Sequence, residues 1–163
     1  MAARPPLSLK GRALQWLSQR EHSHIELRRK LMRAARLRDE AVAAEIEAQE
    51  RGAEVDALLH WLTENNYLSE TRFVESRIHA RAARFGQRRI AHELSQHGTS
   101  LDADTAERLR TSEFARAQAL WTRRFGAEPA ADAALRAKQM RFLAGRGFAS
   151  DVIRRVVRGA DDD

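Results

Sequence analysis

The chain has 163 residues, with 29 Lys or Arg against 23 Asp or Glu and a formal net charge of +6. It has no cysteine, which excludes disulfides and thiolate metal sites. It also lacks a phosphate-binding loop, a dinucleotide-binding glycine turn, a nucleophile elbow and any run near the about 20 apolar residues of a membrane span. We therefore predict a cytoplasmic protein with no catalytic residue, no cofactor and no metal, which binds a polyanion.

The composition favours an all-α fold, because Ala, Arg, Glu and Leu are abundant and there are only three Pro and one Tyr. In the first block, Leu14, Trp16 and Leu17 mark one helix. Ser23 is predicted to cap a second helix, with Glu26 completing a capping box. This helix is expected to continue into the Ala- and Glu-rich residues 36–54, and a third helix is expected at about 53–65.

Two further blocks follow the same plan. Ser69 is predicted to cap a helix whose apolar residues fall on one face and which ends at Gly86. A short helix through Ile90 and Leu94 comes next, and then a helix near 102–110. The last block predicts helices at 112–125, 131–145 and 150–158, with Ser150 as an N-cap. These signals together predict nine helices in three sets of three.

An internal repeat supports this grouping. The triplet Arg84-Phe85-Gly86 returns as Arg124-Phe125-Gly126, and a leucine-centred marker occurs in each block as Glu26-Leu27-x-x-Lys30, Glu93-Leu94-x-x-His97 and Phe142-Leu143-x-x-Arg146. Gly98 and Gly147 follow the last two markers and are typical helix stops. Short Leu-basic patterns also recur by chance in Arg-rich helical proteins, and the recurring glycines are what favour a repeat.

The markers also locate an insertion. They are 67 residues apart in the first interval and 49 in the second, so the first block carries 18 extra residues. Residues 36–56 contain seven acids against three Arg, opposite in sign to the rest, so we place the insertion at about 36–54. We predict three-helix repeats at 11–68, 69–110 and 111–158, a flexible leader at 1–10 and an acidic tail at 159–163.

The histidines do not indicate a metal site. His92 and His97 are five residues apart, which separates them by about 140° around a helix and prevents both from binding one ion. His22 and His24 flank the predicted capping serine and are expected to be solvated loop residues.

Arginines form stripes at equivalent places in the repeats. Arg77, Arg81 and Arg84 lie within about 60° of one another beside an apolar helix face. Arg88 and Arg89 follow a glycine turn, where the next helix is expected to point free N–H groups outward, towards phosphate. The predicted contact set has Arg77, Arg81, Arg84, Arg88 and Arg89 at its centre, with Arg29, Arg33, Arg123 and Arg124 as outlying members.

For any one helix, the alternative is a merely solvated basic face. Recurrence of the stripes in a stacked array favours an extended basic surface. Aromatic residues make up only 6% of the chain and do not alternate with basic ones, so we expect neither a single-strand stacking platform nor sequence-specific base reading.

Four ordered motifs resemble those of the RecX family of recombination regulators. They are Ser23-x-x-Glu26-Leu27-x-x-Lys30-Leu31, Trp61-Leu62-x-x-Asn65-Asn66-Tyr67-Leu68-Ser69-Glu70-x-Arg72-Phe73-Val74, Gly86-Gln87-Arg88-Arg89-Ile90-x-x-Glu93-Leu94-x-x-x-Gly98, and Lys138-Gln139-Met140-Arg141-Phe142-Leu143-x-x-Arg146-Gly147-Phe148. The resemblance spans about residues 11–158. The chain departs from the family at Asn66, where a glycine is usual, and in the acidic insertion.

The resemblance implies a non-enzymatic monomer that acts in homologous recombination, DNA repair and the SOS response. It would form an elongated, curved array of three three-helix repeats in the groove of the RecA filament on single-stranded DNA. There it would suppress strand exchange, ATP hydrolysis and co-protease activity, by blocking filament extension or promoting disassembly. Two alternatives stay open: a helix-turn-helix DNA-binding regulator that reads DNA with residues 87–97, and a structural helical adaptor.

Overall fold

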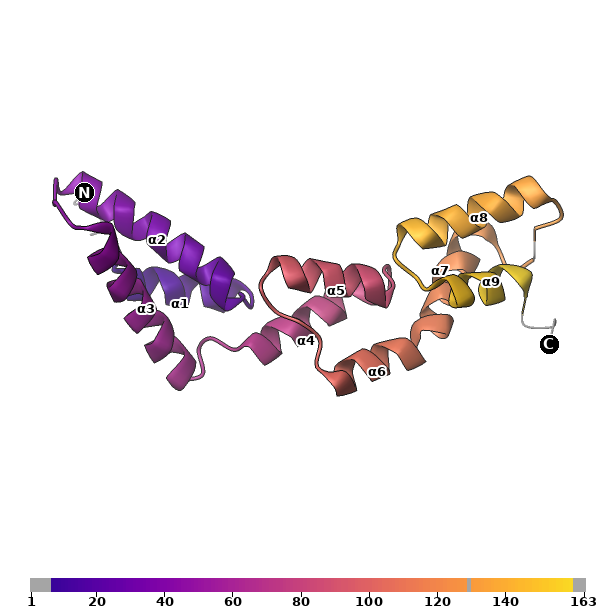
Figure 1. Ribbon diagram of the computed structural model, residues 1–163, viewed down its shortest axis with the longest axis horizontal. Helices are drawn as coiled ribbons and strands as arrows, with labels where there is room; N and C mark the ends of the chain where they lie inside the picture. The colour runs from indigo at the N-terminus through magenta and orange to yellow at the C-terminus, as the bar shows by residue number, and fades with distance from the viewer. Residues whose placement is uncertain (1–6, 129, 160–163) are drawn as a thin grey trace, which may run out of the picture. The chain divides into compact units, whose positions relative to one another are not determined.

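A computed structural model describes residues 7–128 and 130–159, and in these residues it has nine α-helices and no strand (Figure 1). The helices are α1 (Leu9–Gln19), α2 (His24–Ala41), α3 (Ala48–Glu64), α4 (Glu70–Arg81), α5 (Gln87–Gln96), α6 (Ala103–Thr111), α7 (Glu113–Phe125), α8 (Ala133–Gly145) and α9 (Ser150–Arg158). The all-α prediction is confirmed, and the helix order agrees with three sets of three. None of these helices is long and apolar enough to cross a bilayer.

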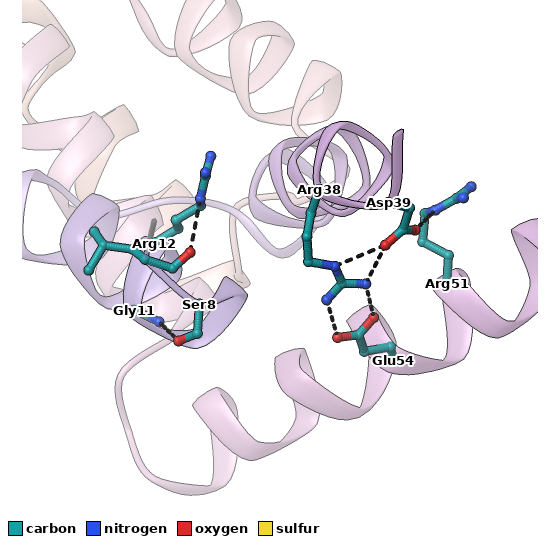
Figure 2. Close-up of polar contacts among 8 residues, drawn as sticks. Ser8, Gly11, Arg12, Arg38, Asp39, Arg51 and Glu54 are labelled. Atoms are coloured by element: carbon teal, nitrogen blue, oxygen red, sulfur yellow. Dashed lines mark hydrogen bonds and ion pairs between the residues drawn. The ribbon is translucent and has the colours of Figure 1, made fainter. Parts of the chain in front are cut away.

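The two ends of the chain only partly overlap the described residues. Ser8 caps α1 by accepting a hydrogen bond from the Gly11 amide at 3.1 Å, and Leu9 is buried (Figure 2). The prediction of a flexible leader is therefore wrong for residues 9–10. The rest of that leader at 1–6 and the acidic tail at 160–163 lie outside the described residues.

Helix starts follow the capping signals with two corrections. Ser23 caps α2 as predicted and accepts from the Glu26 amide at 3.1 Å. The other half of the capping box is not formed, because the Glu26 carboxylate pairs with Arg20 instead. Ser150 is not an N-cap, since it is the first residue of α9 and the N-cap position belongs to Ala149.

The leucine markers occupy equivalent positions. Leu27, Leu94 and Leu143 are all completely buried, in α2, α5 and α8. Gly98 and Gly147 have φ of +71° and +81°, so they end their helices in the conformation that glycine favours. After the first marker no glycine follows, and α2 continues to Ala41.

Helix α4 is shorter than predicted. It ends at Arg81, whereas the sequence pattern placed its end at Gly86. In a continued helix the Gly86 amide would donate to the Ala82 carbonyl. Instead the Gly86 amide donates to the Arg146 carbonyl at 2.9 Å, and the Arg116 guanidinium donates to Ala82 O at 2.8 Å. Arg84 therefore lies in the turn after α4, not on its helical face.

The chain divides within α4 into an N-terminal unit, Met1–Phe73, and a C-terminal unit, Val74–Asp163. In the N-terminal unit α1 and α3 pack against α2 around a core of Leu27, Leu31, Leu59 and Leu62. Asn66, which stands where the family usually has a glycine, adopts φ +59°, a left-handed conformation that Asn tolerates. The predicted repeat boundaries, at 68/69 and 110/111, stay predictions.

The acidic insertion predicted at 36–54 forms the end of α2, the loop 42–47 and the start of α3. Asp39 is only 2% exposed and accepts hydrogen bonds from Arg38 and Arg51 (Figure 2). Arg38 also donates to both carboxylate oxygens of Glu54, at 2.7 and 2.8 Å. The hydrogen bond from Arg51 lowers the pKa of Asp39, so the carboxylate stays charged. This polar network around the buried Asp39 carboxylate ties α2 to α3 near their loop.

His22 is buried, with only 1% of its surface exposed, so the prediction that it is a solvated loop residue is wrong. A carbonyl can only accept and a lysine ammonium can only donate. The Nδ1 of His22 therefore donates to the Arg20 carbonyl at 2.9 Å, and the Nε2 of His22 accepts from Lys30 at 2.9 Å. Burial lowers the pKa of His22, so the ring is neutral. His24 is exposed, as expected, but it is the first residue of α2 and not a loop residue.

In the C-terminal unit, α7, α8 and α9 pack around Leu120, Trp121, Leu143 and Val156 (Figure 1). The segment before α5 contacts the end of α8 directly. A Cβ on Gly86 would lie 2.3 Å from the Gly147 carbonyl oxygen, so only glycine fits there.

The two Arg-Phe-Gly triplets differ in local conformation. Gly86 has φ −75° and begins α5, whereas Gly126 has φ +87° and ends α7. The repeat in sequence is therefore not a repeat in backbone shape at this point.

Candidate nucleic-acid interface

Three of the five central arginines line one pocket, which is formed by α4 and α5. Arg77, Arg81 and Arg89 lie around it with Glu93 and His97, and His92 and Gln96 complete the lining. Arg81 Nε is 3.0 Å from Glu93 Oε2, and Arg89 Nε is 3.6 Å from Glu93 Oε1. Arg77 donates to His97 Nε2 at 3.1 Å. One carboxylate is thus shared by two guanidinium groups, which positions both of them.

Phe85 lies at the centre of a larger arginine group. The guanidinium carbons of Arg81, Arg84, Arg89 and Arg146 lie 5.5, 5.9, 5.2 and 5.4 Å from its ring centroid. We call Phe85 and these four arginines the Phe85 cluster. Such contacts stabilise each cation by about 0.5–1 kcal/mol at exposed sites. The cluster unites the end of α4, the start of α5 and the end of α8.

Aromatic contacts extend from the cluster towards the second Arg-Phe-Gly triplet. Arg146 also lies 5.2 Å from the Phe142 ring, which meets Phe125 edge to face at a centroid distance of 5.3 Å. Arg124 lies 5.9 Å from the Phe125 ring. The sequence has no alternation of basic and aromatic residues, but the fold brings them together in space. The prediction that the chain has no single-strand stacking platform is not tested by these contacts and stays a prediction.

The remaining predicted residues are not part of the Phe85 cluster. Arg88 is exposed on another side of α5, where it lines a second pocket with Arg110, Arg155 and Asp151. Arg123 is exposed near the end of α7. Arg29 and Arg33 are exposed on α2, in the N-terminal unit, and are described with that unit alone.

Two amides at the start of α5 are not free, although the sequence predicts outward-pointing N–H groups there. The Gly86 amide donates to Arg146 O at 2.9 Å, and the Gln87 amide donates to Glu113 Oε1 at 3.0 Å. Glu113 is 3% exposed. These two donors are satisfied inside the protein, whereas no acceptor is seen for the Arg88 and Arg89 amides among the described residues.

Two functionally placed arginines were not predicted. The sequence indicated for Arg146 only a basic residue that stabilises a helix end. Its place in the third leucine marker, equivalent to Lys30 and His97, was the one signal that set it apart. Arg116 had no sequence signal. It donates to the carbonyls of Ala82, Phe85 and Leu109 at 2.8, 2.8 and 2.9 Å, and burial lowers its pKa. Arg116 thereby fixes the turn that carries Arg84.

The arrangement suits anion binding. Guanidinium groups present paired N–H donors that match two oxygens of one phosphate or carboxylate. Within the described residues, no group of three or more His, Asp or Glu is placed to hold a metal ion.

Comparison with known proteins identifies the family. A family model described as RecX, third three-helix domain, matches residues 111–157. Proteins named Regulatory protein RecX are similar along nearly the whole chain. The one from Ralstonia pickettii is 47% identical, covering 98% of this chain and 92% of its own length. The chain belongs to the RecX family of regulatory proteins.

Other RecX proteins show the same extent of similarity. The one from Leptothrix cholodnii is 49% identical, over 98% of this chain and 94% of its own length. The one from Pseudomonas entomophila is 36% identical, over 96% of this chain and 94% of its own length. The RecX third domain, at 111–157, contributes Arg124, Phe125, Phe142 and Arg146 to the contacts described above, while Phe85 precedes it.

Proposed function

We propose that this RecX-family protein regulates the RecA recombinase by binding the RecA filament on single-stranded DNA. It limits filament extension, ATP hydrolysis, strand exchange and co-protease activity, as a cytoplasmic monomer and without catalysis of its own. The observation that carries the proposal is the near full-length similarity to RecX proteins at 36–49% identity. The Phe85 cluster adds a surface whose chemistry fits a phosphate backbone.

The proposed contact surface has a centre and outlying members. Arg84, Arg88 and Arg89 are exposed and can reach phosphates directly, whereas Arg81 is held by Glu93 and acts mainly through its charge. Arg77 lines the same pocket. Arg29, Arg33, Arg123 and Arg124 are exposed and are proposed as further contacts along the filament. Binding of this kind weakens steeply with salt, because each phosphate contact releases counterions.

Time courses of ATP hydrolysis by RecA on single-stranded DNA test the proposal. The wild-type protein should slow hydrolysis progressively. The variant Arg84→Glu, Arg88→Glu should lose most of this effect; neither residue has an ion pair among the described residues, so the fold should be unaffected. The control Arg136→Glu, Arg154→Glu changes net charge equally at exposed residues of α8 and α9 and should inhibit like the wild type.

Two results would contradict the proposal in different ways. If the wild-type protein leaves hydrolysis unchanged, the proposed regulation of RecA is wrong. If Arg84→Glu, Arg88→Glu inhibits as well as the wild type, the contact surface is wrong.

A helix-turn-helix reader is less well supported. A recognition helix contacts base edges with its first turn. The first turn of α5 is instead packed against Gly147, and its amides at Gly86 and Gln87 are used internally. A sequence-specific reader would also prefer one DNA site by several orders of magnitude in competition with unrelated DNA. A structural adaptor would respond to neither DNA nor RecA.

A further inference from the structure

We propose that Arg84, Arg89 and Arg146, gathered around Phe85, form one phosphate-binding site that holds a backbone phosphate of single-stranded nucleic acid. The inference deepens the proposed function, since it rests on this surface meeting the DNA of the filament. It does not depend on the effect on ATP hydrolysis.

The Phe85 cluster has a local excess of positive charge. Four guanidinium carbons lie between 5.2 and 5.9 Å from one ring centroid. Any two of them are therefore within about 12 Å, comparable with the Debye length of about 8 Å at physiological ionic strength, and they repel each other. Glu93 offsets one charge by pairing with Arg81 and Arg89. Arg84 and Arg146 have no carboxylate partner in the part of the chain that the structure describes, so the cluster attracts an anion.

Backbone contacts hold the segments that carry these arginines together without a ligand. The Arg146 carbonyl accepts from the Gly86 amide at 2.9 Å. A Cβ on Gly147 would lie 2.5 Å from Arg89 Cβ, so the end of α8 and the start of α5 are in direct contact. Binding by such preorganised groups costs less ordering entropy than binding by free side chains.

The position of Arg84 is fixed in a similar way. Arg116 donates to the carbonyls of Ala82 and Phe85, which flank Arg84 in sequence. The turn that carries Arg84 is therefore held by hydrogen bonds from the Arg116 guanidinium to main-chain carbonyls. The three arginines therefore come from backbone segments that are tied to one another.

The groups that remain available in the Phe85 cluster indicate the chemical class of the ligand. The Phe85 ring already contacts four cations, so it is poorly placed to stack on a base. The groups that can still bind are guanidinium N–H donors, and these match phosphate oxygens bidentately. A phosphodiester fits the proposed binding to a RecA filament on single-stranded DNA better than an acidic peptide does, and peptide binding is one outcome of the test.

The test measures binding of the full chain to a labelled oligothymidylate, without RecA, over a range of salt concentrations. Each phosphate contact contributes about −0.7 to the slope of log affinity against log salt for single strands. Arg146→Ala and Arg84→Ala should each reduce the slope by up to about 0.7, because the arginines share one phosphate, and weaken binding about tenfold at low salt. Arg141→Ala removes the same charge from an exposed residue of α8 and should change affinity less than about twofold.

Arg146→Lys separates charge from guanidinium geometry. It should keep the wild-type salt slope, since the charge is retained, but bind more weakly than the wild type because an ammonium lacks the paired donors. Urea unfolding of each variant shows whether the fold is intact. If Arg146→Ala is destabilised, Arg84→Ala in the exposed turn decides the question alone.

The inference is overturned if Arg84→Ala and Arg146→Ala bind with the wild-type slope and affinity, or if Arg141→Ala loses as much as they do. It is also overturned if they lose binding to a polyglutamate peptide but keep binding to the oligonucleotide. Failure of the proposed function would look different. In that case the variants would lose oligonucleotide binding as predicted, while the wild-type protein left RecA ATP hydrolysis unchanged.

Discussion

The contact between Gly86 and Gly147 can be tested by adding one methyl group. Gly86 has φ −75°, so alanine has no conformational penalty there. Its Cβ would lie 2.3 Å from Gly147 O and 2.4 Å from Phe148 N, and these are backbone atoms that cannot rotate away. Overpacking commonly costs about 1–3 kcal/mol, and overlap with several backbone atoms puts Gly86→Ala at about 3 kcal/mol or more.

Two other glycines provide controls. Gly126 has φ +87° with nothing within 4 Å of an added Cβ, so Gly126→Ala has a conformational cost alone, of order 1–3 kcal/mol. Gly145 is helical, also with nothing within 4 Å, so Gly145→Ala should stabilise by about 0.5 kcal/mol. The two destabilised variants differ in function. Gly86→Ala should also weaken oligonucleotide binding because it separates Arg89 from Arg146, whereas Gly126→Ala should not.

Urea unfolding followed by circular dichroism measures these effects. With a slope of about 2 kcal/mol/M, a loss of 3 kcal/mol lowers the midpoint by about 1.5 M. The reasoning is refuted if Gly86→Ala is as stable as Gly145→Ala, or if it binds the oligonucleotide like the wild type.

Three further predictions follow from buried polar groups. Arg116→Ala should lower the free energy of unfolding by about 2 kcal/mol, because three main-chain carbonyls lose a charged donor, and Arg116→Lys should restore only part of it in urea unfolding. Burial lowers the pKa of His22, so the unfolded chain binds the proton more readily; stability should fall as pH drops below about 6.5, and less so in His22→Gln. Asp39→Ala should speed hydrogen exchange of the Ala44 amide in the adjoining loop, while exchange at Leu59 stays slow.

Local signals in the sequence were enough to predict the helices. Ser23 caps a helix because its hydroxyl can satisfy a free amide of the first turn, and that depends on neighbours in the chain alone. Gly98 and Gly147 end helices for an equally local reason. The leucine markers were predicted as equivalent, and the burial of Leu94 and Leu143 confirms this interpretation.

What the sequence did not predict depends on contacts between distant residues. Helix α4 ends at Arg81, and Arg116, 34 residues after Ala82, donates to carbonyls of the turn that follows. His22 is buried in the folded chain, where Lys30 donates to its ring, and its position beside a capping serine does not indicate this. Arg146 joins the Phe85 cluster across 61 residues, and no periodicity in the sequence indicates such a pairing.

Arginine footprinting on the filament tests the central claim most directly. The protein is treated with phenylglyoxal, alone and bound to RecA on single-stranded DNA, and modification of each arginine is measured by mass spectrometry. The account predicts that Arg84, Arg89 and Arg146 are protected in the complex, while the exposed Arg136 and Arg141 react as in the free protein. Unchanged reactivity of Arg84 and Arg146 in the complex would contradict it.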